Sequence, residues 1–299
     1  MEIWDIYDKY RRKKIYTHER GKAMKPGDYH IVVHVWIVNS KGEVLIQKRQ
    51  AGKKGWPGMW DCAAAGSAII SDSSRDAAVR ETFEEIGLYI DKDNLEPLFT
   101  VRFAKGFDDN WLIRREVDIE RLVLQEEEVK AVKWVKIEDI LDMVNREEFI
   151  PFPFLDRLFE LVNSNIIIKK TKLKDKKVSR PSGYLVTEDY YDVFLKEKLI
   201  GNILVSDNQL GIVEIRHIKR SRKFLKEEIY EEIISRLEIL YPQAEQFKIF
   251  SDGEVHSSVY KKNGYTILEN SENPEDKVGR VYIKKDIYRM PDIKDLKNR

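Results

Sequence analysis

One stretch of the chain constrains its fold and its chemistry more than any other. Residues 66–88 read GSAIISDSSRDAAVRETFEEIGL, with one glycine at the start and another just before the end. Asp72 and the two serines that follow it are candidate N-caps, because their side-chain oxygens accept hydrogen bonds from free backbone N–H groups. Gly87 is a typical helix stop, because glycine adopts the left-handed conformation without strain. The segment predicts a helix that begins just after Asp72 and ends at Gly87.

The predicted helix carries three glutamates near its C-terminal end. At about 100° per residue, Glu81, Glu84 and Glu85 fall within one arc of roughly 100°. The opposite, packed face is expected to hold three apolar side chains: Val79, Phe83 and Ile86. Carboxylates this close repel one another, and the helix dipole disfavours anions at this end. Either this is an ordinary solvated acidic face, or it holds a hard divalent cation such as Mg²⁺ or Mn²⁺, which binds together with substrate phosphates.

Composition excludes several classes of protein. Lysine and arginine number 53 against 52 acidic residues, so neither a nucleic-acid partner nor a membrane surface is expected. The single cysteine, Cys62, excludes an internal disulfide framework and favours a reducing compartment. The longest apolar run, Ile31–Val38, is too short to cross a bilayer. We therefore expect a cytoplasmic protein.

The length of 299 residues favours two domains. In the first half, periodicity and turn residues predict a hairpin of two strands, 31–38 and 43–49, and three further strands at 97–103, 111–119 and 129–137. They also predict two amphipathic helices besides the acidic one, at 137–146 and 154–164. A basic, apolar-poor run at 169–180 marks a boundary or an exposed strand. Beyond it a hairpin at 191–206 and a long helix at 224–240 begin a second α/β unit. The expected domains are 1–164 and 165–299.

The acidic stretch resembles the Nudix box, G-x5-E-x7-R-E-U-x-E-E-x-G-U, where U is a bulky aliphatic residue. Seven residues match at the required spacing: Gly66, Arg80, Glu81, Glu84, Glu85, Gly87 and Leu88. Asp72 replaces a glutamate of the pattern, and Thr82 replaces an aliphatic residue. GDYHIVVHVWI, LIQKR, WPGMWD and AAAGS extend the resemblance, over about residues 1–160, to Nudix proteins related to isopentenyl-diphosphate isomerase, although Ser67 stands where that subgroup commonly has histidine.

The resemblance implies an α/β/α sandwich with a mixed sheet, and an enzyme that uses Mg²⁺ or Mn²⁺ to hydrolyse a diphosphate linkage. Glu84, Glu85 and the Gly66 carbonyl oxygen would be metal ligands, Glu81 either a ligand or the base that activates water, and Arg80 would orient the glutamates. No organic cofactor is expected. The substrate would be a nucleoside di- or triphosphate, a nucleotide sugar or a similar small diphosphate.

Further site residues are expected outside the box. QEEEV (125–129) offers Glu127 and Glu128, and we choose Glu128 as the additional metal-binding carboxylate, with an ordinary acidic loop as the alternative. Lys48 and Arg49, at a strand end, are candidates for binding substrate phosphates. Trp60 is the candidate for stacking on a base; Trp56 and Trp111 are alternatives, and all three also suit packing roles.

Two other functions stay open. An isomerase would place a cysteine immediately before the box glycine, where this chain has Ala65. Cys62 lies three residues earlier and so points to the opposite strand face, which predicts a buried, non-catalytic residue. A hydrolase is therefore favoured over an isomerase. The third possibility is a non-catalytic nucleotide sensor whose second domain relays the signal.

The second half more weakly resembles the GCN5-related acetyltransferase fold, over about 180–285. The resemblance rests on the order of strands and on VYKKNGYTI (259–267), similar to that family's closing helix-to-strand turn. The family's phosphate-binding loop contains glycines, whereas RHIKRSRKFLKEE (216–228) has none. We expect an acetyltransferase-like domain without the usual acetyl-CoA binding, whose basic string Lys219, Arg220, Arg222 and Lys223 either contacts anions or begins a solvated helix. Its role would be to cover the cleft or to form a homodimer surface.

Overall fold

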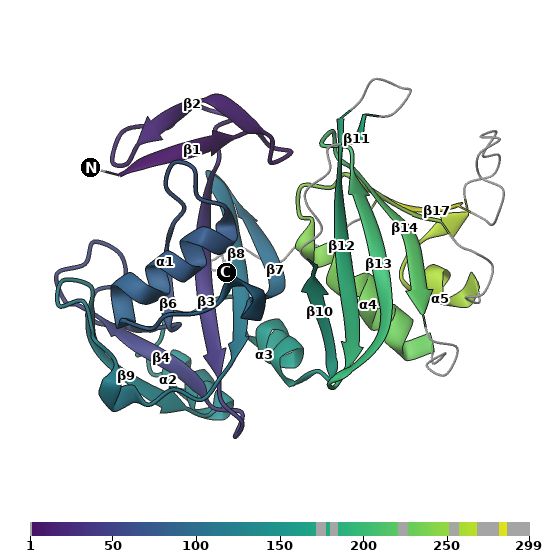
Figure 1. Ribbon diagram of the computed structural model, residues 1–299. Helices are drawn as coiled ribbons and strands as arrows, with labels where there is room; N and C mark the ends of the chain where they lie inside the picture. Colours follow the sequence, from purple (N-terminus) through teal and green to yellow (C-terminus); the bar gives the residue numbers. More distant parts are fainter. Residues whose placement is uncertain are drawn as a thin grey trace. The chain divides into compact units, whose positions relative to one another are not determined.

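The computed structural model describes residues 2–171, 178–179, 185–220, 227–250, 257–267 and 281–285. Within this part the chain separates into two compact units (Figure 1). The first holds Lys13–Ser164 together with the first eight residues, and the second begins at Asn165 and includes Lys9–Arg12. In the described residues no helix is long and apolar enough to span a membrane.

The first unit is built on a seven-stranded mixed sheet. Its strands follow the order β5 (Trp60–Asp61), β4 (Val44–Arg49), β3 (His30–Val38), β8 (Gly106–Arg114) and β7 (Glu96–Phe103), with β6 (Ala64–Ser67) paired to β3 and β9 (Val129–Val135) paired to β4. β3 and β8 are parallel, and the other pairs are antiparallel. The predicted mixed sheet is confirmed, but the strand expected at 111–119 begins five residues earlier, at Gly106.

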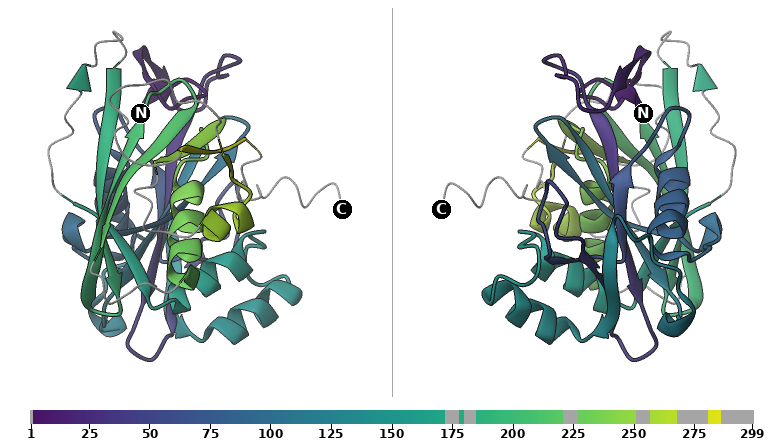
Figure 2. Two further views of the ribbon diagram at one scale, coloured as in Figure 1. Left: turned by 90° about the vertical axis from the view of Figure 1, so that its right-hand side faces the viewer. Right: turned by 90° about the vertical axis from the view of Figure 1, so that its left-hand side faces the viewer.

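Helices cover both faces of this sheet. Figure 2 shows α1 (Ser74–Ile86) on one side and α2 (Ile137–Asn145) with α3 (Leu155–Asn163) on the other. Short 3-10 turns lie at Lys92–Asn94 and Ile119–Arg121. An N-terminal hairpin, β1 (Ile3–Tyr7) with β2 (Lys13–Glu19), forms a separate two-stranded sheet that sequence analysis did not predict.

Both faces of strand β3 are covered, so most of its residues are buried. Val33, Val35 and Ile37 belong to the core that also includes residues of α1. His34 and Trp36 point the other way, and their rings lie 5.2 and 6.0 Å from the Phe152 ring. The sheet therefore presents an apolar face to the box helix and an aromatic and polar face to the opposite layer.

Helix α1 is rotated relative to the prediction. Phe83 was expected on the packed face, but 57% of its surface is exposed. Glu85 was expected on a separate carboxylate face, but only 5% of it is exposed. Ile86 is buried, as predicted, and Thr82 is fully buried beside it. The face that carries Glu85 is therefore turned toward the sheet.

The second unit has an eight-stranded sheet. Its order is β10 (Ile166–Lys170), β12 (Leu185–Leu195), β13 (Lys198–Asp207), β14 (Ile212–Arg220), β15 (Gln246–Phe250), β17 (Val281–Lys284) and β16 (Thr266–Ile267), with β11 (Val178–Ser179) paired to β12. Among the described strands, β14 and β15 form its one parallel pair. Helices α4 (Glu227–Leu240) and α5 (Ser257–Lys262) contribute to its core.

The predicted hairpin at 191–206 and the long helix are present in this unit. The described part of the helix starts at Glu227. The expected anion-contacting residues Arg222 and Lys223 lie outside the described residues, as do the side chains of Lys219 and Arg220.

Candidate active site

The box helix begins and ends through local hydrogen bonds. Ser73 is the N-cap: its Oγ accepts from the Asp76 backbone N–H at 3.2 Å, and the Asp76 carboxylate accepts from the Ser73 N–H at 3.0 Å. This reciprocal capping box satisfies two N–H groups that would otherwise lack partners. Gly87 ends the helix in the left-handed conformation, with φ at 67°. Because Ser73 caps the helix, Asp72 is left to bind another group.

Gly66 and Glu81 are in direct contact. Gly66 lies on β6, next to β3, and α1 brings the Glu81 carboxylate against its Cα. A Cβ at residue 66 would overlap that carboxylate. The first glycine of the box is therefore required by the close approach of a box glutamate.

Arg80 connects the carboxylates of the box. Its guanidinium donates to Asp72 Oδ2 at 3.0 and 3.1 Å and to the Ser67 carbonyl at 2.9 Å. The remaining Nη1 donates to Glu81 at 2.9 Å and to Glu84 at 3.0 Å. Burial lowers the pKa of Arg80, but the charge and hydrogen bond of Glu81 outweigh it, so the pKa is raised overall. This arrangement also shows that Asp72, although shorter than the glutamate of the pattern, reaches the arginine.

Glu85 is the most buried acid of the box. Its Oε2 accepts from Gln47 Nε2 at 2.8 Å and from the Ala65 backbone N–H at 3.1 Å. In the contacts described for this part of the chain, both donors are neutral. Burial raises the pKa of Glu85 to about 7, against the lowering effect of these two hydrogen bonds. A carboxylate held in this way is suited to a cationic partner.

The pKa of Glu81 is also raised, and the Glu84 side chain is open to solvent. Burial raises the pKa of Glu81, although the charge of Arg80 opposes the change. The Glu84 side chain is 49% exposed. The three box glutamates therefore form a gradient from a buried acid at Glu85 to a solvated one at Glu84.

The acidic loop after the 3-10 turn Ile119–Arg121 lies against the end of α1. The Gln125 N–H donates to the Glu85 carbonyl at 2.9 Å. Glu128 in the same loop forms an ion pair with Lys53, and Gln50 Nε2 donates to the Glu126 carbonyl at 2.7 Å. Of the two predicted alternatives, Glu127 is exposed and Glu128 is half-buried. The structure thus places Glu128, with its lysine, close to the box.

Of the three predicted substrate-binding residues, Lys48 and Trp60 do not lie on the face of the box carboxylates, whereas Arg49 contacts Asp61 beside Gln47. Gln47 and Asp61 are register neighbours, as are Lys48 and Trp60. Because successive strand residues alternate faces, Lys48 and Trp60 lie on the face opposite to Gln47 and Glu85. Lys48 and Lys133 there lie 5.5 and 4.3 Å from the Trp60 ring. Arg49 donates to Asp61 at 3.1 Å and to the Gly55 carbonyl at 3.1 Å.

The other two tryptophans differ from one another. Trp111 is 8% exposed, belongs to the α1 core and donates to Ser74 Oγ at 3.0 Å. Trp56 is 37% exposed in the loop before β5. Of these two alternatives for base stacking, only Trp56 offers an open face.

Sequence analysis missed two residues that face the box. Gln47 hydrogen-bonds Glu85, and Lys53 pairs with Glu128. Burial and then the charge of Arg49 lower the pKa of Lys53, while Glu85 and Glu81 oppose this change, so the ammonium lies within the field of the box. For Gln47 the signal was a polar residue inside an apolar strand. For Lys53 there was no signal beyond a lysine in a glycine-rich loop.

The donor set fits a hard divalent cation. Glu81, Glu84, Glu85 and the Gly66 carbonyl supply oxygen atoms only, which Mg²⁺ and Mn²⁺ prefer. The buried Glu85 carboxylate and the Glu81 carboxylate packed on Gly66 come from one helix beside one strand.

Comparisons with known proteins agree with this geometry. The family model for the NUDIX domain matches residues 28–158. A protein of Listeria innocua described as an uncharacterized Nudix hydrolase is 47% identical over 167 residues, which cover 56% of this chain and 99% of that protein. An Escherichia coli isopentenyl-diphosphate Delta-isomerase is 26% identical, covering 42% of this chain and 72% of the isomerase. A crystal structure from Deinococcus radiodurans, 18% identical, covers 54% of this chain and 99% of its own with a TM-score of 0.46. The family model and the Listeria innocua protein show that the chain belongs to the Nudix family of hydrolases.

Proposed function

We propose that this protein hydrolyses a diphosphate linkage in a small nucleoside diphosphate derivative, using Mg²⁺ or Mn²⁺. The observation that carries the proposal is Glu85: a buried carboxylate with a pKa of about 7, held by neutral donors beside Glu81. Burying such a group costs free energy that a divalent cation offsets.

The proposed ligands are the Gly66 carbonyl oxygen and four carboxylates: Glu81, Glu84, Glu85 and Glu128. A divalent cation bound there would neutralise charge on the phosphate oxygens and lower the pKa of an attacking water. Glu81, whose pKa is raised by burial, is either a ligand or the group that accepts the water proton. Arg80 acts as a positioning residue, because its contacts are to box carboxylates and a backbone carbonyl.

Substrate contacts are proposed at two places. Lys53 lies beside Glu128 and the box, so its ammonium is suited to bind a substrate phosphate. Lys48, Arg49 and Trp60 remain candidates on the adjacent strands. Of these, Arg49 already neutralises Asp61.

The test is a screen of diphosphate compounds with Mg²⁺ or Mn²⁺, measuring phosphate, pyrophosphate and nucleoside monophosphate. We expect turnover of at least one class, and Glu85→Gln is expected to lower kcat by about 10² or more because it removes one ligand charge. Glu138→Gln, an exposed acid on α2, is the matched control and should change little. Nucleotide binding without turnover across the panel would instead favour the sensor.

The isomerase is the second candidate, favoured by the similarity to the Escherichia coli isomerase. Against it, Ala65 stands immediately before Gly66, and Cys62 is fully buried. We expect no isomerisation of isopentenyl diphosphate. Formation of dimethylallyl diphosphate by the wild-type protein would overturn the hydrolase assignment.

We also propose that residues 1–164 form the hydrolase domain and 165–299 an acetyltransferase-like domain. The support is the sheet of the second unit, in which antiparallel strands lead into one described parallel pair, β14 and β15, joined through α4. Because 216–228 lacks glycine, we expect no acetyl-CoA binding that survives about 0.5 M salt, where screening is strong. Calorimetry with acetyl-CoA at that salt concentration tests this, and saturable binding would contradict it.

A further inference from the structure

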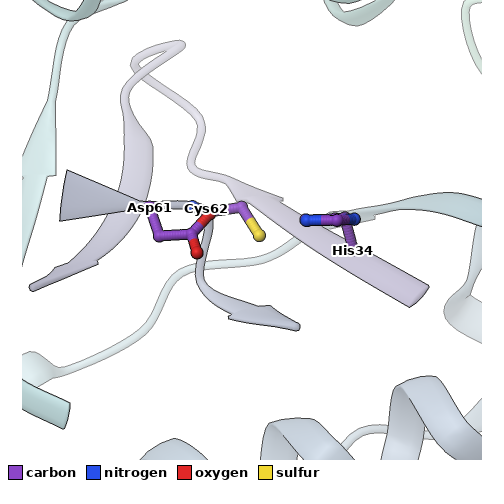
Figure 3. A group of neighbouring side chains, drawn as sticks. All are labelled: His34, Asp61 and Cys62. Carbon is purple, nitrogen blue, oxygen red and sulfur yellow. Dashed lines mark hydrogen bonds between the residues drawn. The ribbon is translucent and has the colours of Figure 1, made fainter. Parts of the chain in front are cut away.

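Three potential metal ligands meet in the first unit outside the box. They are His34 on β3, Asp61 at the end of β5, and Cys62, which follows it. One ligand atom from each lies within 4.8 Å of the others. Figure 3 shows the Cys62 sulfur and a ring nitrogen of His34 facing one another, with Asp61 beside the thiol. The box function uses none of these three side chains.

Asp108 orients the histidine. His34 Nδ1 and Asp108 Oδ1 are 2.7 Å apart, and the edge of the ring packs against Phe152. With Nδ1 held by a carboxylate, Nε2 is the nitrogen left to present a lone pair. Such a carboxylate–histidine pair is the usual support of a histidine that binds a metal. This contact is independent of the three-residue cluster and also points to a ligand role.

The cluster is buried, and its polar atoms can still bind a metal ion. Cys62 and Asp61 are 0% and 2% exposed. Asp61 accepts from Arg49 at 3.1 Å through Oδ2 and from the Cys62 N–H at 2.8 Å through Oδ1. Each carboxylate oxygen has a second lone pair, so these bonds do not exhaust Asp61. The thiol donates to the Ala64 carbonyl at 3.2 Å, a weak bond that deprotonation would remove.

The charges of the cluster and of the two groups bonded to it, Asp108 and Arg49, balance with a divalent ion. A Cys62 thiolate, Asp61 and Asp108 contribute three negative charges. A divalent ion and Arg49 contribute three positive charges, with His34 neutral. A buried thiolate is costly when its charge is not compensated, and here it would be compensated within contact distance.

We propose that His34, Asp61 and Cys62 form a second metal site, for a borderline ion such as Zn²⁺. Sulfur, nitrogen and oxygen donors together select this class of ion, whereas the all-oxygen box selects a harder one. On binding, the Cys62 S–H bond breaks, a metal–sulfur bond forms, and the proton is released to solvent. Three protein ligands leave a fourth position for water.

One residue, Gln47, links the proposed site to the box. Asp61 pairs in register with Gln47, which hydrogen-bonds Glu85. A metal that joins His34 on β3 to Asp61 and Cys62 would tie the short strand β5 to the centre of the sheet. We therefore expect this ion to stabilise the fold and to hold the strand that carries Gln47 and Arg49.

The test uses Co²⁺ as the probe, added to full-length protein in excess Mg²⁺ so that the box is occupied. One equivalent is expected to produce thiolate-to-cobalt charge-transfer absorption, visible bands of a four-coordinate ion, and release of one proton. Cys62 is the only cysteine in the chain, so the charge-transfer band identifies the ligand without a variant. Absence of that band in the wild-type protein would overturn the proposal.

Variants then identify the other ligands. His34→Asn and Asp61→Asn should weaken Co²⁺ binding at least tenfold, while His18→Asn, on the separate hairpin, should not. Glu85→Gln should leave the charge-transfer band unchanged while lowering hydrolysis, which separates this site from the box. Thermal unfolding of each variant verifies that it is folded; if both ligand variants fold and keep wild-type Co²⁺ affinity, the site is wrong.

Discussion

The carboxylate of Glu81 occupies the space that a side chain at residue 66 would fill. This contact joins the first glycine of the box to a glutamate 15 positions later, on a different element. The two residues therefore act as one unit: the absence of a side chain at Gly66 determines where the Glu81 oxygens lie.

Gly66→Ala is expected to lower hydrolysis by about a hundredfold, because small displacements of a catalytic group have effects of this size. Stability should change by only about 1 kcal/mol, since the displaced group is the end of a flexible side chain. Kinetics and thermal unfolding of the purified variant measure the two effects. In a double-mutant cycle with Glu81→Ala, the two losses should not add. Additive losses would show that Gly66 acts through another contact.

Glu85 should make the metal-free protein less stable as pH rises. Its folded pKa of about 7 lies above its usual 4.5, so between these values the folded state binds more protons than the unfolded state. The unfolding free energy then falls with increasing pH, by on the order of 3 kcal/mol in total from this group. Urea unfolding with a chelator present, at about pH 5 and about pH 8, measures the change.

Glu85→Gln is the matched variant for this pH dependence. It keeps the shape and an acceptor for Gln47 but cannot ionise, so its stability should vary less between the two pH values. At the higher pH the metal-free variant should be more stable than the wild type, although less active. Equal pH slopes for the two proteins would show that Glu85 is not the ionising group.

Lys53 is expected to compete with the metal for Glu128. In Lys53→Met the ammonium no longer neutralises that carboxylate, so Mn²⁺ affinity should rise by about three- to tenfold, as expected for a partly exposed pair. The KM for substrate should also rise, because a phosphate-binding cation is lost. Mn²⁺ titration by electron paramagnetic resonance measures the first effect. Lys54→Met, its exposed neighbour, is the control, and equal affinities in all three proteins would exclude Lys53 from the site.

Thr82 stands where the box pattern has an aliphatic residue. It is fully buried, and its Oγ1 donates to the Ala78 carbonyl at 2.7 Å. Thr82→Val removes this donor, but the Ala78 carbonyl still accepts the helical hydrogen bond from the backbone N–H of residue 82. The free energy of unfolding should therefore be unchanged or higher by up to about 1 kcal/mol. Thermal unfolding checks this. A loss of more than about 2 kcal/mol would mean that the hydroxyl has a structural role that valine cannot fill.

The extent of the box helix could be predicted because its determinants are local. Ser73 and Asp76 cap the start and Gly87 ends it, all through contacts within a few residues along the chain. Spacing likewise brought Arg80 and Glu84 together, since residues four apart share a helix face. The β3–β4 and β12–β13 hairpins were also predicted, whereas the β1–β2 hairpin was missed and β8 began earlier than its apolar pattern indicated.

The orientation of that helix could not be predicted in the same way. Periodicity groups side chains into faces but does not say which face meets the sheet. Phe83 is exposed and Glu85 is buried because Gln47 and the Ala65 N–H, from two strands, receive the carboxylate. The hydrogen bonds available at that position offset the cost of burying an acid, and they come from distant parts of the chain.

The sequence by itself determined the family, the helix and the kind of donor atoms at the box. Only the tertiary structure decided which residues share a site. Strand register placed Lys48 and Trp60 away from Glu85, and it brought His34 to Cys62 across 28 positions of sequence. The physical reason is that capping and helical spacing act between near neighbours in the chain, whereas sheet register and layer packing depend on every strand at once.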